Sequence, residues 1–168
     1  NSTPTLALVP VTAQYKIPQL CGALNDGITK QGSKYIFRNT PPGSAYETTI
    51  VNFMVSQGYK KFGIISDTSA YGKGQGDYQE AALAKHNLKA VARESYGIED
   101  KDFTGQLTKI FQGQPEVLLI AGSEVAAGLI AKQARQLGFK GAIAGGAAVG
   151  TTKFVEVAAE AAEGAFYS

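Results

Sequence analysis

Residues 61–76 read KFGIISDTSAYGKGQG, and this stretch decides the fold. The apolar run at 61–66 predicts a buried strand, because short apolar runs bounded by turn residues are typical of strands covered on both faces. The polar segment 67–71 and a glycine-rich entry then lead into a helix expected at about 73–86. A strand, a loop and a helix in this order begin a βαβ unit.

The same alternation runs through the rest of the sequence. Further strands are expected at 17–22, 34–38, 88–94, 116–121, 141–145 and 165–167. Further helices are expected at about 2–15, 44–58, 103–112, 125–137 and 153–162. Strands that alternate with helices predict an α/β protein, and we expect a three-layer αβα fold with a mostly parallel sheet.

Two of the helix starts carry capping signals. Ser2 and Thr3 precede Pro4, which predicts a hydroxyl N-cap with proline in the first turn, where its missing N–H costs nothing. Ser44 is followed three residues later by Glu47, which predicts a capping box.

Ligands of parallel α/β sheets bind beyond the carboxyl ends of the strands. Three segments are expected on that rim, namely 67–71, 122–124 and 146–150. Each precedes a helix N-terminus, which favours negatively charged groups. The sequence therefore predicts an edge of the sheet that is suited to an anion.

The composition excludes several classes of protein. Of the 168 residues, 44% are apolar and 18% are charged, the net charge is +2, and the basic residues are scattered, so we expect no nucleic-acid partner. The longest apolar runs, such as 117–121, are too short to span a membrane. Cys21 and His86 are the only residues of their types, which excludes an internal disulfide and the usual zinc clusters. We expect no cofactor and no metal.

Catalytic and nucleotide-binding motifs are weak. Gly72, Gly74 and Gly76 alternate, whereas a dinucleotide-binding loop needs G-x-G-x-x-G directly after a strand. Cys21 is expected to be a small buried apolar residue, since no histidine pairs with it in the sequence. Asp67 is either a catalytic acid or metal ligand, or a residue that caps a helix or organises its loop, and the second role is commoner. We therefore expect no enzymatic activity.

Seven phrases stand in a characteristic order along the chain. They are NSTPTLALVP, KIPQLCGALNDG, YIFRNTPP, DTSAYGKGQGDYQEAAL, DFTGQLTKI, KQARQLGFKG and AAEGAFYS. By their order and spacing the sequence resembles the type I periplasmic solute-binding proteins, specifically the branched-chain amino-acid-binding (Leu/Ile/Val-binding-protein-like) family. The resemblance covers essentially the whole chain.

The resemblance implies two α/β lobes joined by three crossovers, with the ligand bound between the lobes. By that template, residues 1–38 are a remnant of the first lobe, 39–163 form most of the second lobe, and 164–168 are a crossover strand that leads back. The sequence has no initiator Met and no signal peptide, and both ends look cut. We therefore expect it to be part of a longer chain.

The resemblance also implies which residues bind the ligand in the first lobe. A Ser or Thr at the start of a helix holds the ligand carboxylate in the family, and Ser2 and Thr3 match that position. The next family loop reads Ala-Thr, and here it reads Leu24-Asn25. This chain therefore keeps a polar side chain there in altered form.

In the second lobe the match to the family is less complete. The family's aromatic residue is kept as Tyr71, whereas a loop that often presents a tyrosine reads Ser123-Glu124 here. Ala147 stands where amino-acid binders of the family place an acidic residue that neutralises the ligand ammonium. Because a buried ammonium without a partner is costly, either Glu124 supplies that charge or the ligand has no ammonium.

The function implied by the resemblance is capture of a small carboxylate, either an amino acid or a related organic or aromatic acid. The protein would be the periplasmic or otherwise extracytoplasmic component of an ABC importer, with a membrane permease as its partner. The alternative is the ligand-sensing core of a receptor or transcription regulator of the same fold.

Overall fold

The structure is a computed structural model that describes all residues, 1–168. The elements, in chain order, are α1 (Ser2–Gln14), β1 (Gln19–Cys21), the 3-10 turn η1 (Asp26–Ile28), β2 (Ile36–Arg38), α2 (Gly43–Ser56), β3 (Phe62–Asp67), α3 (Ala70–Lys85), β4 (Ala90–Tyr96), α4 (Thr104–Gln112), β5 (Val117–Ala121), α5 (Glu124–Gln136), β6 (Ala142–Gly145), α6 (Thr152–Ala158), the 3-10 turn η2 (Ala159–Ala162) and β7 (Phe166–Tyr167).

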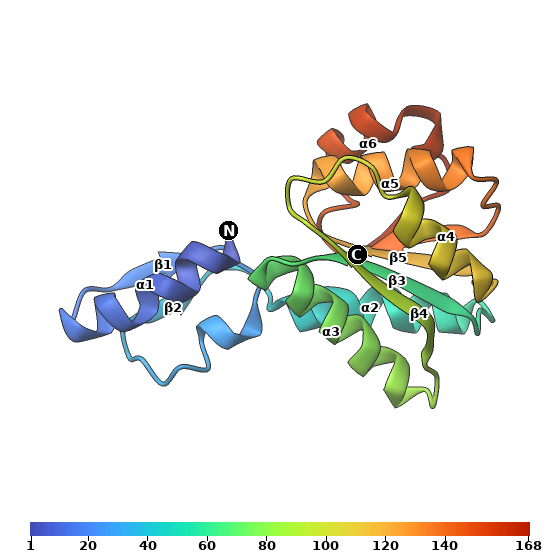
Figure 1. Cartoon of the computed structure of the whole chain (residues 1–168). Helices are drawn as coiled ribbons and strands as arrows, with labels where there is room; N and C mark the ends of the chain where they lie inside the picture. Colours follow the sequence, from blue (N-terminus) through green and yellow to red (C-terminus); the bar gives the residue numbers. More distant parts are fainter.

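The strands form two separate parallel sheets. The larger has the order β4-β3-β5-β6-β7, and the smaller consists of β1 and β2. Residues 1–38, which hold α1, β1, η1 and β2, form a small part of the molecule. Figure 1 shows it in blue at the left, beside the larger body that holds the five-stranded sheet. The predicted α/β fold class, with its mostly parallel sheet and flanking helices, is confirmed.

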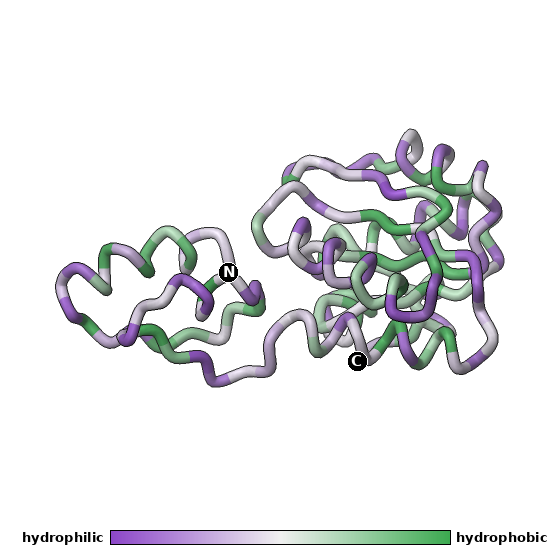
Figure 2. The backbone as a smooth tube through the Cα atoms, turned by 90° about the horizontal axis from the view of Figure 1, so that it is seen from below, coloured by the Kyte–Doolittle hydropathy of each residue, from purple (hydrophilic) through white to green (hydrophobic).

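Helices cover both faces of the larger sheet, which gives it a core on each side. Strand β3 is buried along its whole length, and its side chains alternate between the faces, as the pleat requires. Ile65 packs into a core of 18 buried residues that includes side chains of α4, α5 and α6. Phe62 and Ile64 pack into a core of 10 buried residues shared with α2 and α3. In Figure 2, several segments through the centre of the body are green, the colour of hydrophobic residues.

The small part contacts the body through specific hydrogen bonds. Ser44 at the start of α2 donates its backbone N–H to Asp26 Oδ1 at 3.2 Å and its hydroxyl to Asp26 Oδ2 at 2.7 Å. Tyr78 Oη of α3 accepts the backbone N–H of Asp26 at 2.8 Å. Asp26 therefore joins the small part to both α2 and α3.

These contacts correct the predicted capping box. The N-cap of α2 is Pro42, and no side chain of the helix caps it. Glu47 is only 1% exposed and accepts a hydrogen bond from Gln79 Nε2 of α3 at 2.8 Å. The capping-box prediction is wrong, because Asp26 satisfies the helix start from outside and Glu47 is used in helix–helix packing.

The start of α3 also differs from the prediction. The helix begins at Ala70 rather than near residue 73, and its N-cap Ser69 accepts the backbone N–H of Gly72 at 3.1 Å. The glycine-rich stretch is therefore inside the helix. Gly72 and Gly76 sit so close to neighbouring side chains that any larger residue would collide with Asp67 or Arg93. No helix of the chain combines the length and apolarity needed to cross a bilayer.

Candidate functional site

A cavity of about 760 Å³ lies between the start of α1 and the carboxyl-end rim of the five-stranded sheet. Its walls come from all three rim segments that the sequence predicts, after β3, β5 and β6, and from the loop after β1. The strands are parallel and in register, with Ser66 opposite Ala121 and Ile120 opposite Gly145. Their following loops therefore open on the same side.

Seven of the eight residues predicted to bind a ligand line this cavity. They are Ser2, Thr3, Leu24, Tyr71, Ser123, Glu124 and Ala147. The structure thus brings together residues that lie up to 145 positions apart, while their binding roles stay predictions.

Asn25 is the predicted residue that does not line the cavity. Its Oδ1 accepts the backbone N–H of Gly27 at 2.9 Å, and its Nδ2 donates to the carbonyl oxygen of Ala70 at 2.6 Å. Both ends of the amide are therefore occupied, one in the turn η1 and the other at the start of α3. Its backbone N–H donates to Ser2 Oγ at 3.2 Å.

The start of α1 is capped differently from the prediction. Asn1 is the N-cap, and its Oδ1 accepts the backbone N–H of Thr3 at 3.3 Å, so the prediction that Ser2 or Thr3 caps the helix is wrong. Thr3 Oγ1 instead accepts the backbone N–H of Ala70 at 3.2 Å. The Ser2 and Thr3 oxygens each accept a bond, and the hydroxyl hydrogens remain able to donate to a ligand.

Four helices begin at this cavity, and the N-cap of each lines it. The caps are Asn1 of α1, Ser69 of α3, Ser123 of α5 and Thr151 of α6. Sequence reasoning placed Ser69 in the rim segment 67–71 without a binding role, and it missed Asn1 and Thr151 as cavity residues. A signal was available, since each is a Ser, Thr or Asn directly before a helix on the rim.

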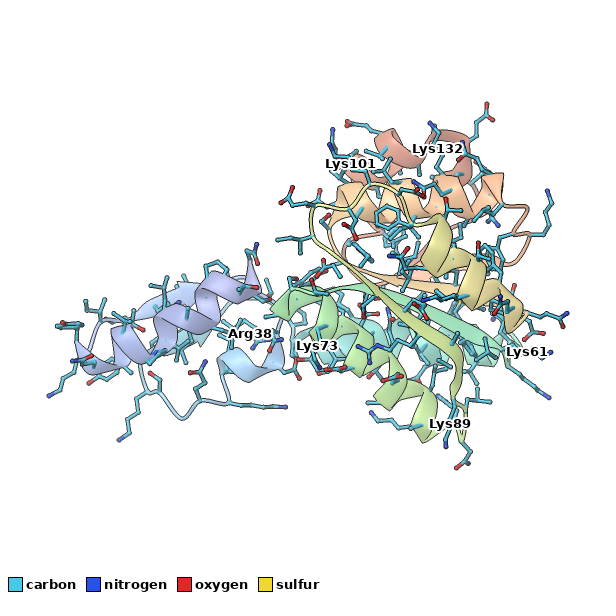
Figure 3. All side chains as sticks on the ribbon, viewed as in Figure 1. Arg38, Lys61, Lys73, Lys89, Lys101 and Lys132 are labelled. Atoms are coloured by element: carbon cyan, nitrogen blue, oxygen red, sulfur yellow. The ribbon has the colours of Figure 1, made fainter.

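The charged side chains of the cavity are both acidic. Asp67 and Glu124 line it, and no Lys, Arg or His does. Basic residues are instead dispersed over the surface, as the labelled Arg38, Lys73 and Lys132 illustrate in Figure 3. No group of three or more His, Cys, Asp and Glu side chains is placed to hold a metal ion.

The two carboxylates have different surroundings. Asp67 is 5% exposed, and its Oδ1 accepts the backbone N–H of Ser69 at 2.8 Å. This bond shows Asp67 organising the loop between β3 and α3, one of the two roles expected from the sequence. Glu124 is the first residue of α5 and is exposed, where the helix dipole favours a negative charge.

Tyr71 lines the cavity, and its hydroxyl is neutral. Burial raises its pKa to about 12, and the neighbouring carboxyl group of Glu47 adds to the shift. Asp67 and Glu124 contribute in the same direction. The phenol therefore keeps its proton at neutral pH and remains a hydrogen-bond donor.

Glu47 lies behind the cavity wall. Burial raises the pKa of its carboxyl from 4.5 to about 8, while hydrogen bonds from Gln79 and the backbone of Gly146 oppose the shift. Gly146 directly precedes Ala147 of the cavity wall, and a side chain on Gly146 would collide with Glu47. Glu47 thus packs against the loop after β6 on the side away from the cavity and accepts a hydrogen bond from its backbone.

The whole chain, residues 1–168, matches the family model described as periplasmic binding protein. Leu/Ile/Val-binding protein homolog 3 of Brucella melitensis is 26% identical over 147 residues, which are 87% of this chain and 40% of that protein. An amino acid binding protein of Pseudomonas aeruginosa is 31% identical over 121 residues, which are 70% of this chain and 32% of that protein. The chain spans less than half the length of these relatives.

Solved structures agree with this assignment. An extracellular ligand-binding receptor from Rhodopseudomonas palustris is 29% identical with a TM-score of 0.90, covering 96% of this chain and 45% of that one. The branched-chain amino acid transporter substrate-binding protein of Streptococcus pneumoniae, in complex with isoleucine, is 30% identical with a TM-score of 0.75, covering 92% of this chain and 44% of that one. The family predicted from the sequence is confirmed: the chain belongs to the periplasmic binding proteins, in their type I, Leu/Ile/Val-binding-protein-like branch.

Proposed function

We propose that this chain is part of the extracytoplasmic solute-binding component of an ABC importer and captures a small carboxylate, an amino acid or a related organic or aromatic acid. The observation that carries the proposal is the convergence of four helix N-caps on one cavity that has no basic side chain. Helix N-termini offer free N–H groups and partial positive charge. They therefore supply the anion-binding groups that Lys or Arg would supply elsewhere.

The relatives support the ligand class. One solved relative holds isoleucine and two curated ones are named as amino-acid-binding or Leu/Ile/Val-binding proteins. A further solute-binding protein from Rhodopseudomonas palustris, in complex with 4-hydroxybenzoate, shares the fold at 16% identity and a TM-score of 0.83. An amino acid and an aromatic acid are thus both reasonable candidates for this cavity.

We also propose which parts of the chain belong to each lobe of the binding protein. Residues 1–38 come from the first lobe, 39–163 form most of the second, and 164–168 lead back toward the first. The cavity lies between α1 and the sheet rim. Two hydrogen bonds cross this junction: the backbone N–H of Ala70 donates to Thr3, and the Asn25 amide donates to the carbonyl oxygen of Ala70. A ligand held by both sides would shift the equilibrium toward the closed form, which a membrane permease would recognise.

Titration followed by ¹⁵N NMR tests the proposal and detects even millimolar binding. The probes are the L-amino acids and 4-hydroxybenzoate, each with a control that lacks the carboxylate, such as 3-methylbutylamine for leucine. Amide shifts around Ser2, Tyr71 and Ser123 are expected with the acid and not with the amine. The proposal fails if no carboxylate shifts these amides, or if the amine shifts them as strongly. Chemical conversion of a bound acid would contradict capture as the whole activity.

A further inference from the structure

Asp67 has one carboxylate oxygen that the fold does not use. Its Oδ1 accepts the backbone N–H of Ser69 at 2.8 Å, whereas no group donates to Oδ2. The side chain is 5% exposed and lines the cavity. Oδ2 is not fully enclosed by protein atoms, so it is reachable from the cavity. The loop-organising role of Asp67 therefore accounts for only half of its carboxylate.

A second unpartnered group lies beside it. Tyr96 is 2% exposed, and its Oη is buried without a hydrogen-bond partner. Both groups meet at Gly122 of the cavity wall, where a methyl group would lie 3.0 Å from Asp67 Oδ2 and would collide with Tyr96 Oη. A free acceptor and a free donor thus flank one glycine at the floor of the cavity.

The charged groups around the cavity indicate which class of ligand this floor binds. The helix N-termini favour the carboxylate of the ligand, but Asp67 and Glu124 add two negative charges that no basic side chain of the lining offsets. A ligand that carries a cationic group as well as a carboxylate would therefore gain more from this wall than a ligand that carries the carboxylate alone.

We infer that Asp67 binds the cationic group of the ligand through Oδ2. Tyr96, whose hydroxyl has no partner in this structure, is then a positioning residue that donates to this carboxylate in the complex. The inference rests on the proposed function, because the same ligand must place its carboxylate at the helix N-termini. It assigns the negative partner of the ligand's cationic group to Asp67, at the floor of the cavity after β3. In amino-acid binders of the family that partner is expected in the loop where this chain has Ala147.

Glu124 is the competing candidate for the same role. It lines the cavity but is exposed, and an exposed charge is screened by water. Asp67 is nearly buried, and its Oδ2 accepts no hydrogen bond within the protein. The burial of Asp67 makes it the stronger partner for a cation.

The isosteric variant Asp67→Asn separates the two roles of this side chain. Its amide oxygen can still accept from Ser69, so the loop is kept, while the charge is lost and the acceptor Oδ2 is replaced by an NH2 donor. Glu124→Gln tests the competing candidate, because it removes a negative charge from the rim of the same cavity. The probes are L-leucine and L-phenylalanine, each paired with its desamino acid, 4-methylpentanoate and 3-phenylpropanoate, and the other L-amino acids are paired in the same way.

We expect the wild type to prefer the amino acid over its desamino partner at least tenfold. Asp67→Asn should remove at least tenfold of that preference while leaving desamino binding unchanged or stronger, and Glu124→Gln should change the preference less than threefold. Equal loss for both partners, an unchanged preference, or a larger effect of Glu124→Gln would overturn the inference.

A measurement on the wild type covers the case in which a variant misfolds. The ¹³C carboxyl resonance of Asp67 should shift when the amino acid binds and stay in place when the desamino acid binds. Tyr96→Phe should reduce that shift and keep the fold by circular dichroism. A wild type that binds only desamino acids would overturn the inference and leave the proposed function standing. A protein that binds no carboxylate of either set would overturn both.

Discussion

Ser2 and Thr3 show how a hydroxyl can serve both the fold and a ligand. Each oxygen accepts one backbone N–H, from Asn25 and Ala70 respectively. Each O–H hydrogen is left free to donate, and both residues line the cavity beside the cap Asn1. The resemblance to the family implied this role in carboxylate binding, while the contacts that hold the hydroxyls in place come only from tertiary structure.

The double variant Ser2→Ala, Thr3→Ala is expected to lose at least about tenfold in affinity for the ligand carboxylate. Hydrogen bonds to a charged group contribute ~1.5–3 kcal/mol each, and 1.4 kcal/mol corresponds to tenfold. Calorimetric titration measures the change, and Thr5→Ala, in the same helix but outside the cavity lining, is the control. An unchanged dissociation constant would place the carboxylate elsewhere.

Glu47 should make the stability of the protein fall as pH rises. Its pKa is about 8 in the folded protein and 4.5 without burial, so between these values the folded state holds a proton that the unfolded state releases. The stabilisation is complete below about pH 4.5 and is lost on approaching pH 8. Urea unfolding should show a loss on the order of 2–4 kcal/mol between pH 5 and 8.

Glu47→Gln should largely abolish this slope, because glutamine does not titrate and can still accept from Gln79. The exposed Glu163→Gln is the control and should leave the slope unchanged. Identical slopes in wild type and Glu47→Gln would show that another group carries the pH dependence.

At the scale of elements, the sequence predicted the order and class of every α-helix and of the strands of both sheets. Continuous apolar runs specify β3 and β5, because their side chains divide between two cores. The errors lie where tertiary contacts replace local signals. Glu47 bonds to another helix instead of its own backbone, and Asn25 uses its amide to join η1 to α3. The free oxygen of Asp67 beside Tyr96 has no sequence signature at all.

Two helical glycines should respond oppositely to alanine. In α5, a methyl group on Gly128 would lie 2.7 Å from Val157 Cβ of α6, whereas one on Gly105 of α4 would meet nothing within 4 Å. Gly128→Ala should therefore cost about 1–3 kcal/mol of unfolding free energy, and Gly105→Ala should add about 0.4–1 kcal/mol by reducing the entropy of the unfolded chain. Chemical denaturation measures both, and equal effects would contradict the close approach of α5 and α6.

At the scale of the whole molecule, the two sheets differ in how well they are buried. The small part has a core of four buried residues, Val9, Ala23, Ile28 and Ile36, against 18 and 10 in the two cores of the body. Leu20 and Phe37, paired across β1 and β2, are 71% and 52% exposed. Local stability follows buried apolar contact, so it should be lower in the small part.

Hydrogen exchange of this chain should therefore show a steep gradient. Amides of β1 and β2 should exchange at least about a hundredfold faster than those of β3 and β5, because the short sheet opens without unfolding the body. Leu20→Ser should leave the unfolding free energy within about 0.5 kcal/mol, whereas Ile64→Ala, in the body, should cost about 2–5 kcal/mol. If residues 1–38 belong to a lobe completed by further chain, a longer natural form should protect β1 and β2 and leave β3 unchanged. Equal protection of both sheets in the 168-residue chain would contradict the gradient, and with it the proposal that residues 1–38 are part of an incomplete lobe.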